Sequence, residues 1–269
     1  MKKEIERFAR LFRGLNRAYG ALDITTKDAR GKQKGIYKFV HEPRTTATYA
    51  SHLKGEVSIG VVPINEDDAC LWGAIDIDQY PLDHSEVLKR LSRLELPLVV
   101  CRSKSGGAHL YLFFKEFVEA EKVQLKLKEI AAEIGYGGCE IFPKQIKLVL
   151  ERGDNGNFLN LPYFDHEGGL RYAFNKDGSA ATIAEFLDQA EASAITEDQL
   201  EGLLSKSVPV VDDKLKDGPP CLQALLRQGF PEGTRNNGLF NLGVYLRKAY
   251  PDDWETKILD YNQTIMEPA

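Results

Sequence analysis

Two aspartates separated by one residue carry the clearest chemical signal in this sequence. Asp76 and Asp78 alternate with Ile75 and Ile77 in the run Ile-Asp-Ile-Asp. On a β-strand, side chains two residues apart point to the same face, with their Cα atoms roughly 6.5–7 Å apart. We therefore expect both carboxylates on one face and both isoleucines buried on the other. Two neighbouring negative charges favour a divalent cation between them, although the same spacing also occurs on solvated edge strands.

A basic, glycine-containing segment that ends at His109 is the second signal. It reads Arg-Ser-Lys-Ser-Gly-Gly-Ala-His and lies between two expected strands. Adjacent glycines let the backbone turn tightly and present N–H groups to an anion. Arg102 and Lys104 would neutralise phosphate charge, and the hydroxyl of Ser103 or Ser105 would donate to phosphate oxygens. A hairpin turn with incidental polar residues accounts for the same segment equally well.

A third group of polar residues follows further along the chain. Glu140 opens the short apolar run Glu-Ile-Phe-Pro-Lys-Gln, which places Lys144 four residues later. Downstream, Asn157 and Asn160 are candidates to hydrogen-bond a ribose or a base. A loop that satisfies its own backbone through these asparagines is the alternative interpretation.

Composition limits the classes of function that need to be considered. The chain has 269 residues, a formal net charge of −5 and 43% hydrophobic residues, which is ordinary for a globular protein. A negative net charge requires any nucleic-acid surface to be a local patch. The four scattered cysteines form no Cys-x-x-Cys pair, so no zinc is expected and a cytoplasmic location fits. The sequence contains neither a signal core nor a membrane-spanning run.

Hydrophobic periodicity predicts an α+β fold built from hairpins rather than regular βαβ units. The basic segment 27–35 is expected to be a loop, and Thr45 or Thr46 to cap a short helix that ends near Leu53. Strands 57–64 and 70–78 are expected to pair as a hairpin around a turn at 65–68. Helices are expected at 3–14, 85–94, 119–134, 182–192 and 197–204, and further strands at 98–101, 110–114, 140–142, 146–150 and 158–161.

The second half of the chain suggests a division into two parts. Residues 208–220 have the Pro- and Asp/Lys-rich composition of a linker between a larger domain at 1–207 and a helical domain at 221–269. Within the helical part, Thr234 is a possible cap of a helix. The polar residues Arg235, Asn236 and Asn237 lie at its start. Because the sequence stops inside this helical region, we expect the chain to be a fragment of a longer protein.

Taken together, the three signals resemble the three-motif signature of the archaeo-eukaryotic primase superfamily. The phrases Ser-Lys-Ser-Gly-Gly-Ala-His-Leu-Tyr-Leu-Phe and Glu-Ile-Phe-Pro-Lys-Gln are similar to those of primase-polymerases from phages, plasmids and related mobile elements. The resemblance covers roughly residues 10–190. It implies a core of mixed or antiparallel sheets with an RRM-like module and flanking helices, followed by a small all-α domain.

The resemblance also implies roles for individual residues. Asp76, Asp78 and Glu140 would hold two divalent ions, Mg²⁺ or Mn²⁺. The implied nucleotide-binding residues are Arg102, Lys104, Ser105, Gly106, Gly107, His109, Lys144, Asn157 and Asn160. Two positions depart from the usual pattern, because Gly107 stands where the family has a serine and Glu140 where aspartate is commoner. Ser105 or a backbone N–H would then replace the missing hydroxyl.

The implied activity is template-directed nucleotidyl transfer from nucleoside triphosphates during mobile-element DNA replication. Its partners would be single-stranded DNA template and primer, (d)NTPs and a helicase domain C-terminal to this chain, in the cytoplasm of the host if a phage encodes it. Arg235, Asn236 and Asn237 would be weak candidates for contact with the template. No membrane partner is expected. One alternative is a catalytically inert nucleic-acid or nucleotide-binding module. A second is an Asp-x-Asp nucleotide-sugar transferase, which would require a parallel nucleotide-binding sheet ahead of Asp76.

Overall fold

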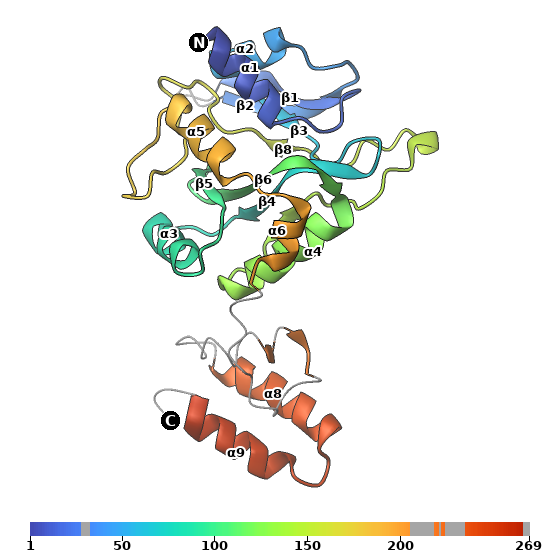
Figure 1. Ribbon diagram of the computed structural model, residues 1–269, viewed down its shortest axis with the longest axis vertical. Helices are drawn as coiled ribbons and strands as arrows, with labels where there is room; N and C mark the ends of the chain where they lie inside the picture. The colour runs from blue at the N-terminus through green and yellow to red at the C-terminus, as the bar shows by residue number, and fades with distance from the viewer. Residues whose placement is uncertain (28–32, 205–217, 221, 224–234, 266–269) are drawn as a thin grey trace. The chain divides into compact units, whose positions relative to one another are not determined.

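The computed structural model divides the chain into two compact units, Met1–Ser205 and Lys206–Ala269. It describes residues 1–27, 33–204, 218–220, 222–223 and 235–265 (Figure 1). Most of the predicted linker at 208–220 lies outside these described residues. In the part that is described, no helix has the length and apolar character needed to cross a membrane.

Two four-stranded sheets form the frame of the first unit (Figure 1). The first sheet has the order β2-β1-β3-β8 and the second the order β5-β6-β4-β7. The strands are β1 (Tyr19–Lys27), β2 (Gln33–Val40), β3 (Ile59–Val61), β4 (Ala69–Ile77), β5 (Val99–Arg102), β6 (Ala108–Glu119), β7 (Glu140–Phe142) and β8 (Leu159–Asn160). Every pair of these described strands is antiparallel, which confirms the α+β class. The parallel sheet that a nucleotide-sugar transferase requires is absent from the described residues.

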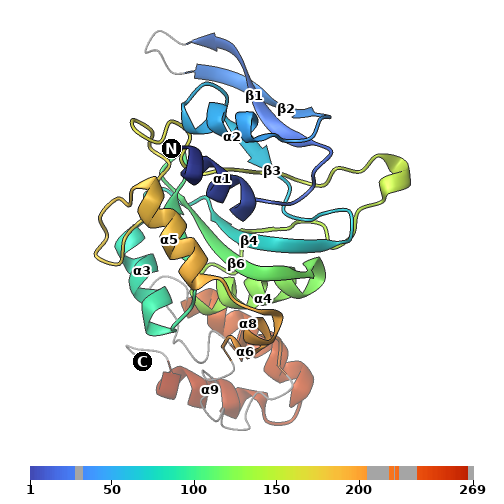
Figure 2. The same cartoon turned by 45° about the horizontal axis from the view of Figure 1, so that its top comes forward.

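Helices pack on both faces of the second sheet (Figure 2). The described helices of the first unit are α1 (Lys2–Leu11), α2 (Thr46–Leu53), α3 (His84–Arg93), α4 (Ala120–Glu133), α5 (Ile183–Ser193) and α6 (Glu197–Gly202), with a 3₁₀ turn η1 (Leu150–Arg152). Helix α4 contacts β4, β6 and β7, whereas α5 contacts β5 and β6. Thr45 caps α2, because its hydroxyl accepts a hydrogen bond from the Thr48 N–H.

The two faces of the second sheet bury separate apolar cores. Ile75 and Ile77 are fully buried in the core that includes the apolar face of α4. Tyr111 and Phe113 of β6 point the other way and pack with Phe12 in the core that includes residues of the first sheet. Strand alternation therefore places Asp76 on the face directed toward the first sheet. The predicted burial of both isoleucines is confirmed.

The expected hairpin between strands 57–64 and 70–78 is wrong. Strand β3 ends at Val61 and belongs to the first sheet, whereas β4 belongs to the second. The Val62 carbonyl accepts a hydrogen bond from the Leu15 N–H, and Pro63 has no N–H to donate to a ladder. A single isolated bridge between Ile64 and Cys70 is what remains of that pairing.

Two further expectations also fail. The segment 27–35, predicted as a loop, contains the end of β1 and the start of β2; residues 28–32 lie outside the described part. Strand β2 is an edge strand in which Ile36 is 62% exposed, so it lacks a regular pattern of buried residues. The predicted strand at 146–150 is not a strand, because the Leu148 N–H donates to the Asp68 carboxylate rather than to a neighbouring strand.

The described elements of the second unit are helices α8 (Arg235–Ala249) and α9 (Trp254–Ile265), which contact each other. Their packing buries Leu242 and Leu246 of α8 together with Leu222 and Tyr261. The proposed cap Thr234 lies outside the described residues, as do the side chains of the three template candidates at 235–237.

Candidate active site

Strand β4 lies between β6 and β7, and this order brings the three sequence motifs together. Asp76 is the register partner of His109 on β6 and of Glu140 on β7. Directly opposed residues in antiparallel strands have Cα atoms about 4.5–5.5 Å apart. Asp78 follows two residues after Asp76 and therefore belongs to the same side of the strand. Asp76 and Glu140 are more than sixty residues apart in the sequence, and with His109 they form one row across three strands.

Asp76 is a carboxylate without a hydrogen-bonding partner. Its side chain is 14% exposed, and its buried Oδ1 accepts no hydrogen bond, although His109 Nε2 lies 3.3 Å away. Burial, followed by the nearby charges of Asp78 and Glu140, raises the pKa of Asp76 to about 7. The negative charge of this group is thus unfavourable until a cation compensates it.

The other two acids of the predicted triad have partners in this structure. Asp78 accepts a hydrogen bond from the Tyr80 hydroxyl at 2.7 Å. Glu140 is 60% exposed, and its carboxylate lies 2.7 Å from the Lys144 ammonium. Within the described ranges, no group of three or more His, Cys, Asp or Glu side chains is arranged to hold a metal ion. Asp76 with its unpaired oxygen fits a divalent cation, because hard cations prefer carboxylate oxygen.

Asp76 and Asp78 open into a pocket of about 240 Å³ between the two sheets. Its lining residues are Tyr37, Asp76, Asp78, Ser103, Lys104, Ser105, His109, Phe142, Phe158, Leu159, Asn160 and Arg171. Seven residues singled out in the sequence are therefore brought together here: both aspartates, Ser103, Lys104, Ser105, His109 and Asn160.

Several other predicted residues lie outside the pocket lining. The Arg102 guanidinium donates to the Leu170 carbonyl at 3.1 Å. Asn157 forms hydrogen bonds with Gln145 through both its side chain and its backbone N–H. Glu140 and Lys144 pair with each other beside the pocket.

The hairpin between β5 and β6 depends on its glycines. Gly106 has a φ of +100°, a conformation that side-chain-bearing residues rarely adopt. A Cβ atom at Gly107 would lie 2.1 Å from the Ile77 carbonyl oxygen, so the hairpin approaches β4 too closely for any side chain there. The Ser103 Oγ lies 3.3 Å from that Cβ position, is buried and has no hydrogen-bond partner. Ser103 thus brings a hydroxyl next to Gly107, the position where the resemblance expects one.

Arg171 is a site residue that the sequence analysis missed. Its side chain is buried, with the residue 7% exposed, and it donates to Ser58 Oγ at 2.9 Å and to the Tyr37 hydroxyl at 3.4 Å. No carboxylate in the described part of the chain lies within ion-pairing distance of it. A buried guanidinium without an acid is costly, and an anionic ligand would compensate it. Arg171 follows Gly-Gly-Leu and has no neighbouring motif, so nothing in its sequence surroundings marked it.

His109 is held neutral by this environment. Burial, and next the positive charge of Arg171, lower its pKa to about 4. Unsatisfied polar atoms of three side chains meet in the same pocket, namely Asp76 Oδ1, Ser103 Oγ and Asn160 Oδ1. Because buried polar groups are normally hydrogen-bonded, this convergence indicates a polar ligand site.

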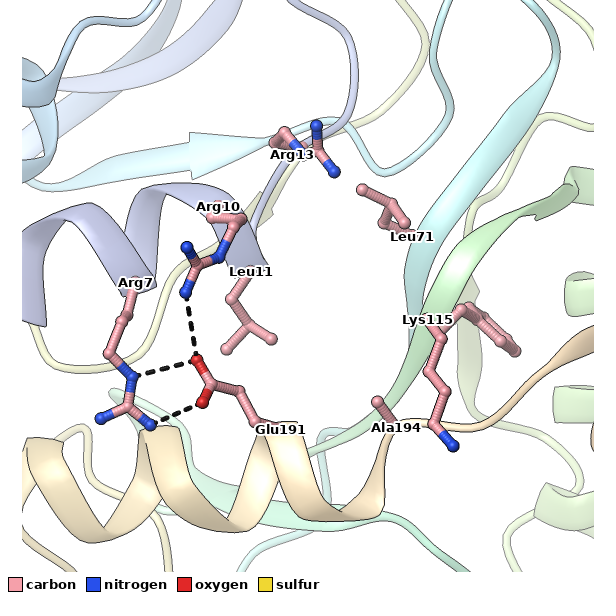
Figure 3. A pocket seen from close by; sticks show the side chains of 9 residues that line it. Arg7, Arg10, Leu11, Arg13, Leu71, Lys115, Glu191 and Ala194 are labelled. Carbon is pink, nitrogen blue, oxygen red and sulfur yellow. Dashed lines mark hydrogen bonds and ion pairs between the residues drawn. The ribbon is translucent and has the colours of Figure 1, made fainter.

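A second pocket, between α1 and α5, has an arginine-rich lining but a different character (Figure 3). Glu191 accepts hydrogen bonds from Arg7 at 2.8 and 3.0 Å and lies 3.5 Å from Arg10. Arg7 also pairs with Asp188. These carboxylates compensate Arg7 and Arg10, whereas Arg171 in the Asp76 pocket has no such partner among the described residues.

Comparison with known families identifies the first unit. Residues 17–201 match the family described as "TOTE conflict system, Archaeo-Eukaryotic Primase domain". The chain belongs to this archaeo-eukaryotic primase family. The matched residues of the primase domain include all three motifs and Arg171.

Solved structures of primases are similar to the primase domain in fold. One is the primase-polymerase domain of cyanophage S-2L, with 13% identity, a TM-score of 0.39 and coverage of 71% of this chain and 98% of that one. Another is primase RepB′, with 12% identity, a TM-score of 0.38 and coverage of 99% and 94%. A third is the catalytic domain of RepB′ in complex with initiator DNA, with 11% identity, a TM-score of 0.35 and coverage of 75% and 95%. No curated protein matches the chain.

Proposed function

We propose that the primase domain is a template-directed DNA primase-polymerase that transfers a nucleotide from a nucleoside triphosphate to a primer 3′-hydroxyl or to an initiating nucleotide. The observation that carries this proposal is the row formed by Glu140, Asp76 and His109 across three strands, beside a pocket with unpaired polar atoms. The family match supports nucleotidyl transfer at the level of the family.

In this proposal Asp76, Asp78 and Glu140 hold the divalent ions, Mg²⁺ or Mn²⁺. Bound divalent ions would supply charge neutralisation for the attacking and leaving oxygens. Asp76 contributes the unpaired oxygen, and Asp78 contributes an exposed carboxylate that now accepts from Tyr80. Glu140 reaches the site only if it leaves Lys144, so we expect this ion pair to exchange when the site is loaded.

The cationic and hydroxyl groups of the pocket suit the triphosphate. Lys104, in the hairpin between β5 and β6, and the buried Arg171, in the segment after β8, supply positive charge. Ser103 supplies the hydroxyl that Gly107 lacks, with Ser105 at the exposed rim. His109 orients the phosphate chain next to Asp76. Positioning and charge neutralisation account for most of the rate in phosphoryl transfer, so no side chain needs to act as a nucleophile.

The side of the pocket formed by the first sheet suits the nucleoside. Asn160 offers an unpaired amide group, and Phe158 offers an aromatic ring. Cβ atoms at Gly20 and Gly60 would lie within 2.6 Å of that ring, so the two glycines of paired strands form a flat seat that fixes it. We assign the sugar and base of the incoming nucleotide to this side.

Primer extension tests the proposal. The wild-type domain, with Mg²⁺ or Mn²⁺ and a labelled primer on a short single-stranded template, should extend the primer. Asp76→Asn and Asp78→Asn should each lower the rate by at least about 100-fold, because metal ligands contribute several kcal/mol of transition-state stabilisation. Asp198→Asn, the same change at an exposed position of α6, is the control and should leave the rate unchanged.

The same assay distinguishes the proposed enzyme from the remaining alternative, an inert binding module. A catalytically inert binding module would bind template or nucleotide and yet extend no primer in either metal. An unprimed template would show whether the domain starts chains or only extends them.

We further propose a role in mobile-element replication, a helicase partner and template contact by residues 235–237. Crosslinking of single-stranded DNA to the full chain would test the last of these.

A further inference from the structure

Tyr111 places its hydroxyl between the two sheets, directly behind His109. The hydroxyl lies 3.1 Å from His109 Nδ1 and 3.3 Å from the Asn160 carbonyl oxygen. His109 and Tyr111 share one face of β6, whereas Asn160 belongs to β8 of the other sheet. One hydroxyl thus connects two residues of the pocket that come from separate sheets.

We infer that Tyr111 is a positioning residue, whose hydroxyl fixes both the ring orientation and the Nδ1–H tautomer of His109. The inference rests on the proposed function, in which His109 contacts the nucleotide. The tyrosine itself does not line the pocket and would act through the histidine.

The tautomer follows from counting donors and acceptors. A tyrosine hydroxyl has a single proton, and a carbonyl oxygen can only accept. Both contacts are hydrogen bonds at the same time only if the Tyr111 proton is used on the Asn160 carbonyl and the hydroxyl oxygen accepts from His109. Nδ1 then carries a proton whether the imidazole is neutral or cationic. This leaves Nε2, which lies 3.3 Å from Asp76, as the nitrogen through which a cationic His109 would donate to a phosphate oxygen.

The position of the Tyr111 hydroxyl is fixed by the surrounding core. The side chain is fully buried, and its ring packs edge-on against Phe12 at 5.4 Å and stacks with Phe113 at 5.8 Å. Trp72 closes a third side at 5.7 Å. A ring held by three aromatic neighbours has little freedom, so the hydroxyl is a stable reference point for His109.

Tyr111→Phe removes this hydroxyl without changing the shape of the ring. A suitable control is Tyr163→Phe, because the buried Tyr163 hydroxyl also donates to a carbonyl, that of Ala181 at 2.9 Å, and accepts from the Ala173 N–H at 3.1 Å. Tyr163 does not line the pocket. Both variants lose a buried hydroxyl that has hydrogen-bond partners, two for Tyr111 and three for Tyr163, but only Tyr111→Phe removes a partner of His109.

Two measurements on the full chain follow. The ¹⁵N chemical shifts of the His109 ring, assigned with His109→Ala, should show the Nδ1–H tautomer in the wild type and in Tyr163→Phe, and a mixture in Tyr111→Phe. The Kd of a fluorescent dNTP with Mg²⁺ should rise about 3- to 10-fold in Tyr111→Phe, the equivalent of about one hydrogen bond, and stay unchanged in Tyr163→Phe. In a His109→Ala background, Tyr111→Phe should have no further effect on that Kd.

A wild-type tautomer and an unchanged Kd in Tyr111→Phe would overturn the inference, as would an equal rise of Kd in Tyr163→Phe. The ring measurement requires no catalysis. A mixed tautomer in Tyr111→Phe from a protein that extends no primer would therefore refute the proposed function and support the positioning role.

Discussion

The most informative residue is Asp76, because the fold keeps its carboxylate where a negative charge is unfavourable. It is buried beside two other acids and lacks a hydrogen-bond donor for one oxygen. Selection for stability alone would not retain a carboxylate at this position, because an uncharged side chain of the same shape would cost less to bury. The proposed role of Asp76 as a ligand of a divalent cation would explain why this cost is kept.

Asp76→Asn should therefore stabilise the protein at high pH. The native pKa of about 7 lies above the ordinary 3.8, so the protonated carboxyl favours the folded state below about pH 4, and this contribution is lost as the pH rises through 7. The free energy of unfolding of Asp76→Asn, relative to that of the wild type, should be up to about 4 kcal/mol higher at pH 8 than at pH 4. This figure follows from the difference of roughly three between the folded and unfolded pKa of Asp76. Urea unfolding at both pH values measures this difference.

Asp198→Asn serves again as the control and should show no comparable dependence on pH. An Asp76→Asn variant whose stability relative to the wild type is the same at pH 4 and pH 8 would show that the carboxylate is not strained.

At the scale of elements, strand order and register create the site. Strand β4 takes its place between β6 and β7, and the hairpin before β6 must approach β4 closely for His109 to lie opposite Asp76. Gly107 permits this approach, because its missing side chain leaves room for the Ile77 carbonyl.

Gly107→Ala should accordingly destabilise the protein by about 1–3 kcal/mol, the usual cost of forcing an extra carbon into a packed position. Gly138→Ala is the matched control, since a Cβ atom there meets nothing within 4 Å. We expect it to change the free energy of unfolding by less than about 0.5 kcal/mol. Equal effects of the two substitutions in chemical denaturation would contradict the close approach of hairpin and strand.

More of the candidate site than of the strand pairing around it could be predicted from the sequence. Alternation along a strand is local, so the shared face of Asp76 and Asp78 and the burial of Ile75 and Ile77 could be read directly. Pairing between distant strands is not local, and the expected hairpin with residues 57–64 was wrong because those residues joined the other sheet. Arg171 could not be found, because its role depends on being buried without an acid, which a sequence does not display.

At the scale of the whole molecule, the chain consists of two units with separate cores. Among the described residues of the second unit, Leu242 and Leu246 are buried in a small cluster with Leu222 and Tyr261. A substitution in that cluster should therefore destabilise the second unit and leave the pocket around Asp76 intact.

Leu242→Ala should destabilise the second unit by about 2–5 kcal/mol, the range for deleting a buried leucine. Hydrogen exchange followed by mass spectrometry should show faster exchange in α8 and α9 and unchanged exchange in β4 and β6. Phe240→Ala, on the same helix but 71% exposed, should leave both units unaffected. Faster exchange throughout the first unit in Leu242→Ala would contradict the independence of the two cores.

The central claim is that the pocket beside Asp76 transfers nucleotides under the direction of a template. Single-nucleotide incorporation tests it most directly, with four templates that differ only in the first unpaired base and each dNTP supplied in turn with Mn²⁺. We predict that the added nucleotide follows the template base and that Asp76→Asn abolishes the addition, whereas Asp198→Asn does not. Incorporation that ignores the template base, or that persists in Asp76→Asn at the wild-type rate, would contradict the claim.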